Sequence, residues 1–280
     1  MADTASIATY RYLRISMVGA VVLLAVSVAI ERWQVDCWQT SVSAYYYTPV
    51  RAIFVGMLMA IGMCLIVIKG STQWEDAALN AAGMLAPIVA VVPTSDVGTC
   101  WSQTPIPLPV KDDGELADWV VANIDNNVTA LIVTGILGLI VAAVIASIAT
   151  RNVRAVAEIG PVHMRLGLLG AMAFLVGGAI VFAFWNDFDT RAHGLAAVTM
   201  FLFLALAVGI NAWQRRADPA PRVYCLLYAS IAILMVLAAV VMFPLGSRWT
   251  HMVLILEATE ITLFALFWLV QTNEHWHETV

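Results

Sequence analysis

Eight long apolar stretches are the feature that most restricts what this chain can fold into. Each has about 17–25 residues, the length of helix that crosses the hydrocarbon core of a bilayer. The approximate ranges are 15–31, 51–69, 76–93, 128–149, 163–185, 192–213, 223–243 and 251–271. Lipid offers no partner for unpaired backbone groups, and the period-2 alternation of a membrane barrel is absent. The sequence therefore predicts an all-α, polytopic transmembrane bundle of about eight spans, forming a single domain over residues 1–280.

The composition agrees with a membrane location. Charged residues make up 12% of the 280 residues, and hydrophobic residues make up 61%. A soluble domain usually carries roughly 25% charged residues. The range 76–93 fits the pattern least well, because Asn80, Gly83 and Pro87 interrupt it. The range 15–31 follows a basic segment as a signal peptide does, but it is long for one, so we expect a retained anchor.

The placement of Lys and Arg predicts which way the spans run, because cytoplasmic connections of membrane proteins are rich in these residues. With the N-terminus inside, the inner segments hold nine: Arg11, Arg14, Lys69, Arg151, Arg154, Arg165, Arg215, Arg216 and Arg222. The outer segments hold five: Arg32, Arg51, Lys111, Arg191 and Arg248. We therefore expect both termini in the cytoplasm and the protein in a bacterial-type plasma (inner) membrane. The net charge of −5 and the lack of a basic stripe argue against nucleic-acid partners.

Two cysteines fall in segments that this topology places outside. Cys37 and Cys100 each precede a tryptophan. Cysteines in an oxidising compartment tend to pair. We expect a Cys37–Cys100 disulfide that ties the first outer loop to the second; the alternative is two free thiols on the same side.

The longest predicted extracytoplasmic loop covers 94–126 and is acidic. Within it, Leu116, Trp119, Val120 and Asn123 recur at helical spacing, with acidic residues on the other side. This pattern predicts a short amphipathic helix over 113–124 that lies across the outer face. On the inner side, Thr72 and Glu75 have the spacing of a capping box that starts a helix.

Polar residues at membrane depth are costly and therefore indicate function. They gather at the predicted outer ends of the spans, together with the tyrosines of the segment SVSAYYYTPVR (41–51). The candidate lining of an outward-facing polar pocket is Tyr46, Arg51, Asp96, Asp187, His193, Arg248, His251 and Glu257. Glu257 lies about 9 Å of helix rise below His251. Glu260 lies one turn deeper on the same helix face as Glu257.

Four functions are compatible with such a pocket. The first is binding or handling of a lipid headgroup or a polar solute, with membrane lipid as the partner. In the second, His193 and His251 bind a divalent metal, and the protein is an intramembrane hydrolase of a lipid-linked substrate. The third is a proton- or ion-coupled carrier that uses Glu257 and Glu260. The last is a non-catalytic scaffold in an oligomer or a membrane-protein complex, in which the polar groups serve helix packing.

The motif SxSxYYYTPxRxxFVG, which runs from residue 41 to residue 56, resembles a motif in uncharacterised bacterial multi-pass membrane proteins. It more remotely resembles the DRAM/FRAG-type family, in which a serine-containing loop, a proline and a phenylalanine precede the second span. In that family a histidine starts a later span and an acidic residue marks a late one.

This resemblance matches Ser43, Pro49 and Phe54 to the loop, His193 to the histidine and Glu257 to the acid. It implies lipid handling, because members of that family are linked to lipid remodelling and to phosphoinositide-linked scaffolding. The six spans usual in that family differ from the eight counted above, and neither the cysteine pair nor the 94–126 loop has a counterpart in it.

Overall fold

A computed structural model describes residues 2–100, 109–112, 114–151, 161–216, 222–242 and 249–276. Its helices are α1 (Ala2–Val35), η1 (Ser43–Tyr47), α2 (Arg51–Val67), α3 (Gln73–Val91), α4 (Asp118–Arg151), α5 (Pro161–Phe184), α6 (Phe188–Arg215), α7 (Arg222–Met242) and α8 (Met252–Glu274). Within these ranges the only β pairing is an isolated bridge between Val110 and Leu116. The all-α prediction is confirmed.

Six of these helices, α1, α4, α5, α6, α7 and α8, are long and apolar enough to cross a membrane. The two other predicted spans differ from them. The apolar helix α2 has only 17 residues, and α3 carries Glu75 and Asp76 in its first turn and Pro87 in its interior. The multi-pass character follows from the six helices, and the count of eight spans stays a prediction.

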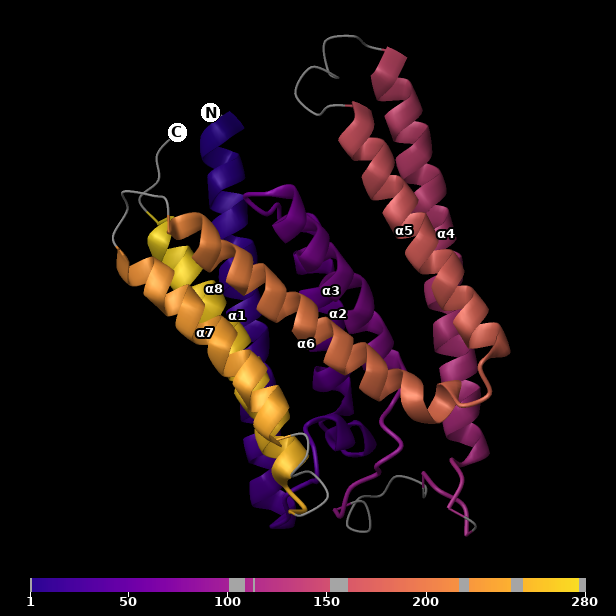
Figure 1. Cartoon of the computed structure of the whole chain (residues 1–280). Helices are drawn as coiled ribbons and strands as arrows, with labels where there is room; N and C mark the ends of the chain where they lie inside the picture. Colours follow the sequence, from indigo (N-terminus) through magenta and orange to yellow (C-terminus); the bar gives the residue numbers. More distant parts are fainter. Residues whose placement is uncertain are drawn as a thin grey trace.

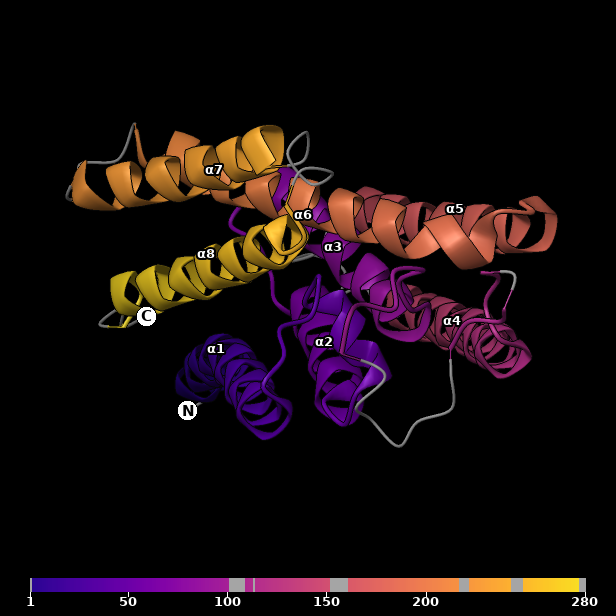
Figure 2. The same ribbon diagram turned by 90° about the horizontal axis from the view of Figure 1, so that it is seen from below.

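The helices run in alternating directions, so that both termini lie at one end of the bundle (Figure 1). In the main body, α6 packs along α3 and α7, α2 packs on α3, and α8 lies between α1 and α7. The hairpin of α4 and α5 stands to one side of this body, as seen also from below (Figure 2). The end opposite the termini carries the α1–α2 connection and the beginnings of α2 and α8.

Glycines allow α2 and α3 to approach closely. A Cβ added at Gly62 would lie 2.8 Å from the carbonyl oxygen of Gly83, and one at Gly83 would lie 2.7 Å from that of Gly62. The two backbones are therefore in direct contact, as in other membrane helix pairs with small residues at the crossing. This contact holds the second half of α2 against the middle of α3.

A disulfide joins Cys37 to Cys100, as the sequence predicts. The side-chain oxygen of Gln39 adds to this link, because it accepts hydrogen bonds from the backbone N–H groups of Thr99 (3.0 Å) and Cys100 (3.3 Å). The α1–α2 connection is thus fixed to the segment that follows α3.

The prediction of a short helix over 113–124 is wrong. The helix begins only at Asp118, and it continues without interruption into α4. No proline or glycine stands between Asp118 and the apolar stretch, so nothing ends the helix there. Its apolar face packs on the bundle through Val120 and Ile124, both fully buried, instead of lying on the membrane surface.

The capping box at the start of α3 forms in part. The hydroxyl of Thr72 accepts a hydrogen bond from the backbone N–H of Glu75, as predicted. The Glu75 carboxylate does not return to Thr72. It accepts hydrogen bonds from the N–H and hydroxyl of Ser71 (2.8 and 2.7 Å) and from the amide of Asn211 (2.8 Å). These contacts explain how a carboxylate that is 1% exposed is tolerated.

Candidate functional site

The tyrosine segment between α1 and α2 folds into the end of the bundle. Residues 43–47 form η1, and all five of its residues are buried. The hydroxyl of Tyr47 donates to the carbonyl of Thr94 (2.7 Å), which fixes η1 to the end of α3. Burial raises the pKa of the Tyr47 phenol, so it is a neutral hydrogen-bond donor. The tyrosines are therefore packed side chains.

Tyr46 and Arg51 form a pair. The guanidinium of Arg51 donates to the Tyr46 hydroxyl (2.7 Å), and its carbon lies 4.3 Å from the centre of the Tyr46 ring. It also lies 6.0 Å from the ring of Trp119 at the start of α4. Burial raises the pKa of Tyr46, and the Arg51 charge opposes this rise. Arg51 thus joins η1, α2 and α4, which is a structural use of its charge.

Three polar side chains that are far apart in the sequence meet beside η1. The Oγ of Ser43 lies 2.9 Å from Oε1 of Glu257 in α8 and 2.8 Å from Nε2 of His193 in α6. The backbone N–H of Ser43 donates to Oε2 of Glu257 (3.1 Å). The Nδ1 of His193 lies 2.6 Å from the carbonyl oxygen of Val92. We call Ser43, His193 and Glu257 the Ser-His-Glu cluster.

Counting hydrogens restricts the protonation states of this cluster. A carbonyl oxygen only accepts, so His193 Nδ1 must carry a hydrogen. If His193 is neutral, its Nε2 accepts the single hydroxyl hydrogen of Ser43. The contact between Ser43 Oγ and Glu257 Oε1 then requires a hydrogen on Glu257. If His193 is a cation, Ser43 instead donates to an anionic Glu257. Both states hold the same number of protons and differ by a shift of two hydrogens through Ser43.

A small cavity of about 50 Å³ lies against the cluster. Ser43 and Glu257 are the polar residues in its wall, and Val42 together with apolar side chains of α1, α2, α3, α6 and α8 forms the rest. A cavity needs roughly 10–15 Å³ to hold one water molecule. This space therefore has room for a water or for a small group of a ligand next to Ser43 Oγ.

A larger apolar groove of about 460 Å³ runs between α1 and α8. Among its lining residues, Ala25 of α1 and Ala258 of α8 are exposed, so the groove opens on the outside of the bundle. Three residues, Val21, Val42 and Ile261, line both the groove and the small cavity. The groove and the small cavity therefore adjoin each other across these three residues.

His251 belongs to the groove and not to the cluster. It stands at the N-terminal end of α8, lines the groove, and its Nδ1 lies 3.1 Å from the carbonyl oxygen of Gln39. His193 has both ring nitrogens engaged by Val92 and Ser43. Over the described ranges, no three His, Cys, Asp or Glu side chains are placed to hold one metal ion. The geometry gives no support to His193 and His251 as a metal pair.

Within the described residues, Asp96, Asp187 and Glu260 make no hydrogen bond or ion pair with the Ser-His-Glu cluster. Asp96 is exposed, and it accepts a hydrogen bond from the N–H of Gly98 (3.0 Å). Asp187 is exposed and pairs with Arg191 one turn along α6 (3.4 Å). Glu260 is buried, one turn deeper than Glu257, and is not among the residues of the cavity or the groove. Arg248 lies outside the described residues.

Sequence reasoning from membrane depth found His193 and Glu257 but not their common partner. Ser43 entered only through the family resemblance, because a serine in a loop is an ordinary residue. The groove was not predicted at all. Its signal is weak, because Ala25 and Ala258 leave space only when α1 and α8 lie side by side.

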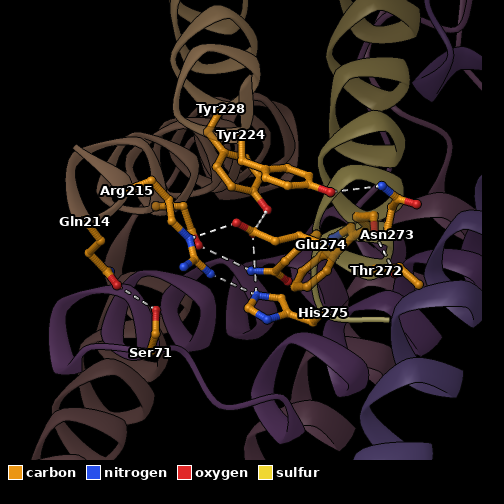
Figure 3. A network of polar contacts seen from close by, with 12 residues as sticks. Ser71, Gln214, Arg215, Tyr224, Tyr228, Thr272, Asn273, Glu274 and His275 are labelled. Carbon is orange, nitrogen blue, oxygen red and sulfur yellow. Dashed lines mark hydrogen bonds and ion pairs between the residues drawn. The ribbon is translucent and has the colours of Figure 1, made fainter. Parts of the chain in front are cut away.

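A second polar network lies at the end of the bundle that carries the termini (Figure 3). The Glu274 carboxylate accepts a hydrogen bond from the Tyr228 hydroxyl (2.6 Å) and pairs with Arg215 (2.9 Å). The Oγ of Ser71 lies 2.8 Å from the side-chain oxygen of Gln214, and Asn273 donates to the Tyr224 hydroxyl (3.1 Å). These contacts join the α2–α3 connection to α6, and α7 to α8, so this network holds the helix ends together.

Comparison of the chain with models of protein families, with curated proteins and with solved structures finds no match.

Proposed function

We propose that the protein binds a membrane lipid, with one acyl chain in the groove between α1 and α8 and the polar part of the lipid at Ser43 and Glu257. The observation that carries the proposal is that the two spaces adjoin, because Val21, Val42 and Ile261 line both the open apolar groove and the cavity beside the Ser-His-Glu cluster. Six helices are apolar enough to lie in a bilayer, so the bilayer around the protein supplies the lipid.

The apolar groove alone gives little selectivity. Moving an acyl chain from lipid into an apolar groove removes no surface from water, so there is no hydrophobic gain. Preference for one lipid must come from hydrogen bonds in the largely apolar cavity, where an unmade bond is costly. Ser43 and Glu257 supply the polar groups that can make them. The proposed ligand therefore carries a hydrogen-bonding group, such as an ester, close to its acyl chain.

Arg51 has no part in this proposal as a phosphate ligand, because its guanidinium already donates to Tyr46 and lies over the Tyr46 ring.

We further propose that all eight helices cross a bacterial plasma membrane with both termini in the cytoplasm. The cluster then lies near the outer leaflet. The resemblance to the DRAM/FRAG-type family favours the same theme, because the residues it matches include Ser43, His193 and Glu257, which form the cluster.

The test is the amount of lipid that stays bound to the purified protein, measured by native mass spectrometry after extensive detergent washing. We expect about one retained lipid in the wild type. Ala25→Trp places an indole inside the groove and should abolish retention. Ala29→Trp, one turn further along α1 at another exposed position, is the matched control and should retain the lipid. Equal retention in both variants would contradict the proposal.

A further inference from the structure

We propose that Ser43 is a nucleophile that accepts the acyl group of a membrane-lipid ester, with His193 as its base. This inference rests on the proposed lipid function and names its reaction. It starts from the distance of 2.8 Å between Ser43 Oγ and His193 Nε2, which is within the range of a serine activated by a neighbouring base.

The hydrogen bond at the other ring nitrogen sets His193 for this role. Its Nδ1–H donates to the carbonyl oxygen of Val92, with 2.6 Å between the nitrogen and the oxygen. A neutral imidazole therefore has its lone pair on Nε2, toward Ser43. A third group that orients the base is the usual companion of a serine–histidine pair, and here a backbone carbonyl takes that position. His193 is 4% exposed, which keeps bulk water away from the base.

Glu257 has a different place from the acid of the usual triad. It contacts Ser43 and not His193, and it shares the cavity wall with Ser43. In the state with neutral His193, Glu257 carries a hydrogen that points at Ser43 Oγ. An ester carbonyl oxygen in the cavity offers that hydrogen a second acceptor, so Glu257 becomes the donor to the oxygen on which negative charge develops.

The reaction balances with water as the co-reactant. Ser43 Oγ attacks the ester carbon while its proton moves to His193 Nε2. The ester C–O bond breaks, and the leaving alcohol takes the proton from His193. Water then attacks the acyl-Ser43 ester and gives a proton to His193. The Oγ–C bond breaks, the proton returns to Ser43 Oγ, and a carboxylic acid leaves.

The cavity and the groove have room for the water and the substrate that this reaction needs. The space beside Ser43 is large enough for a water molecule, and the groove that shares its wall fits an acyl chain. The substrate class is therefore an ester of a long-chain acid that reaches the cluster sideways from the bilayer.

A long-chain alkyl fluorophosphonate tests the proposal, because it reacts with activated serines by forming an Oγ–P bond and releasing fluoride. The probe is added to the full-length protein in lipid nanodiscs, and labelling is followed by intact mass and peptide mapping. We expect one label on Ser43 in the wild type and none in Ser43→Ala. His193→Gln should slow labelling by roughly 100-fold or more, since general bases contribute about 10²–10⁴-fold.

Ser95→Ala, at an exposed serine that follows α3, is the matched control and should label at the wild-type rate. Retained lipid is measured in the same samples, so that a folded but altered variant is recognised. An unlabelled Ser43 in wild-type protein that holds lipid overturns the nucleophile and leaves the lipid site standing. Equal labelling rates in the wild type and His193→Gln also overturn it. Wild-type protein with neither label nor lipid contradicts both proposals.

Discussion

Ser43 has one hydroxyl hydrogen and two neighbours, His193 and Glu257, that lie within 2.9 Å of its oxygen. Which neighbour receives the hydrogen decides whether the cluster is neutral or an ion pair. Removing two charges from water is costly, and a buried ion pair regains this energy only with further hydrogen bonds. Ser43 supplies Glu257 with two such bonds, but the second partner of His193 is only a carbonyl. We therefore expect the neutral state, with a hydrogen on Glu257.

This expectation predicts the effect of Glu257→Gln. A glutamine amide can donate to Ser43 Oγ and accept from the Ser43 N–H, as a protonated Glu257 does, so the free energy of unfolding should change by less than about 1 kcal/mol. Glu257→Ala leaves the Ser43 N–H without a partner and the Ser43 hydroxyl with His193 alone, and it should lower the free energy of unfolding by about 2–3 kcal/mol. Unfolding in detergent, followed by circular dichroism, measures both.

A glutamine variant that is destabilised by about 3–5 kcal/mol would point to the ion pair, because a charged His193 would then have lost its partner.

Of the three residues in the Ser-His-Glu cluster, two could be predicted from their place in the sequence. His193 and Glu257 stand out as polar groups in apolar stretches. Their meeting with Ser43, 150 and 214 residues away, depends on how α6 and α8 pack, which no local pattern encodes.

The helix pair α2 and α3 is held by direct contact between two backbones. A Cβ on Gly62 would lie 2.8 Å from the carbonyl oxygen of Gly83, and one on Gly83 would lie 2.7 Å from that of Gly62. Backbone atoms cannot turn aside, so the helices would have to move apart. We predict that Gly62→Ala and Gly83→Ala each lower the free energy of unfolding by about 1–3 kcal/mol.

Gly56→Ala is the matched control in α2, since a Cβ there has no neighbour within 4 Å. It should leave the stability unchanged or raise it by up to about 1 kcal/mol, because alanine favours the helix. The same detergent unfolding assay compares the three variants. If Gly62→Ala and Gly56→Ala behave alike, α2 and α3 do not touch at this crossing.

The sequence predicted the number and type of the long helices, but it predicted the residues at which they begin and end less accurately. Apolar length sufficed for α1 and for α4 to α8. The segment 113–124 carried a helical period, and residues from Asp118 onward are indeed helical. Periodicity shows that one face is apolar but does not show what covers that face. Here Val120 and Ile124 pack on the bundle, so the helix continues into α4.

For the whole molecule, the proposed lipid site requires a lateral path from the bilayer to a buried serine. All residues of η1 are buried, so a lipid that only coats the outside of the bundle does not touch them. The helices α4 and α5 present broad exposed apolar faces, and any lipid should contact those. Contact of lipid with η1 is therefore the property that separates a bound ligand from the surrounding bilayer.

The most direct measurement uses a phospholipid with a photoreactive diazirine close to the ester of one acyl chain, mixed into nanodiscs with the full-length protein. After photolysis, peptide mapping locates the label. The account predicts label on the peptides that contain Ser43 and Glu257, and its loss in Ala25→Trp but not in Ala29→Trp. Label confined to the exposed faces of α4 and α5, with none on η1 in any sample, would contradict it.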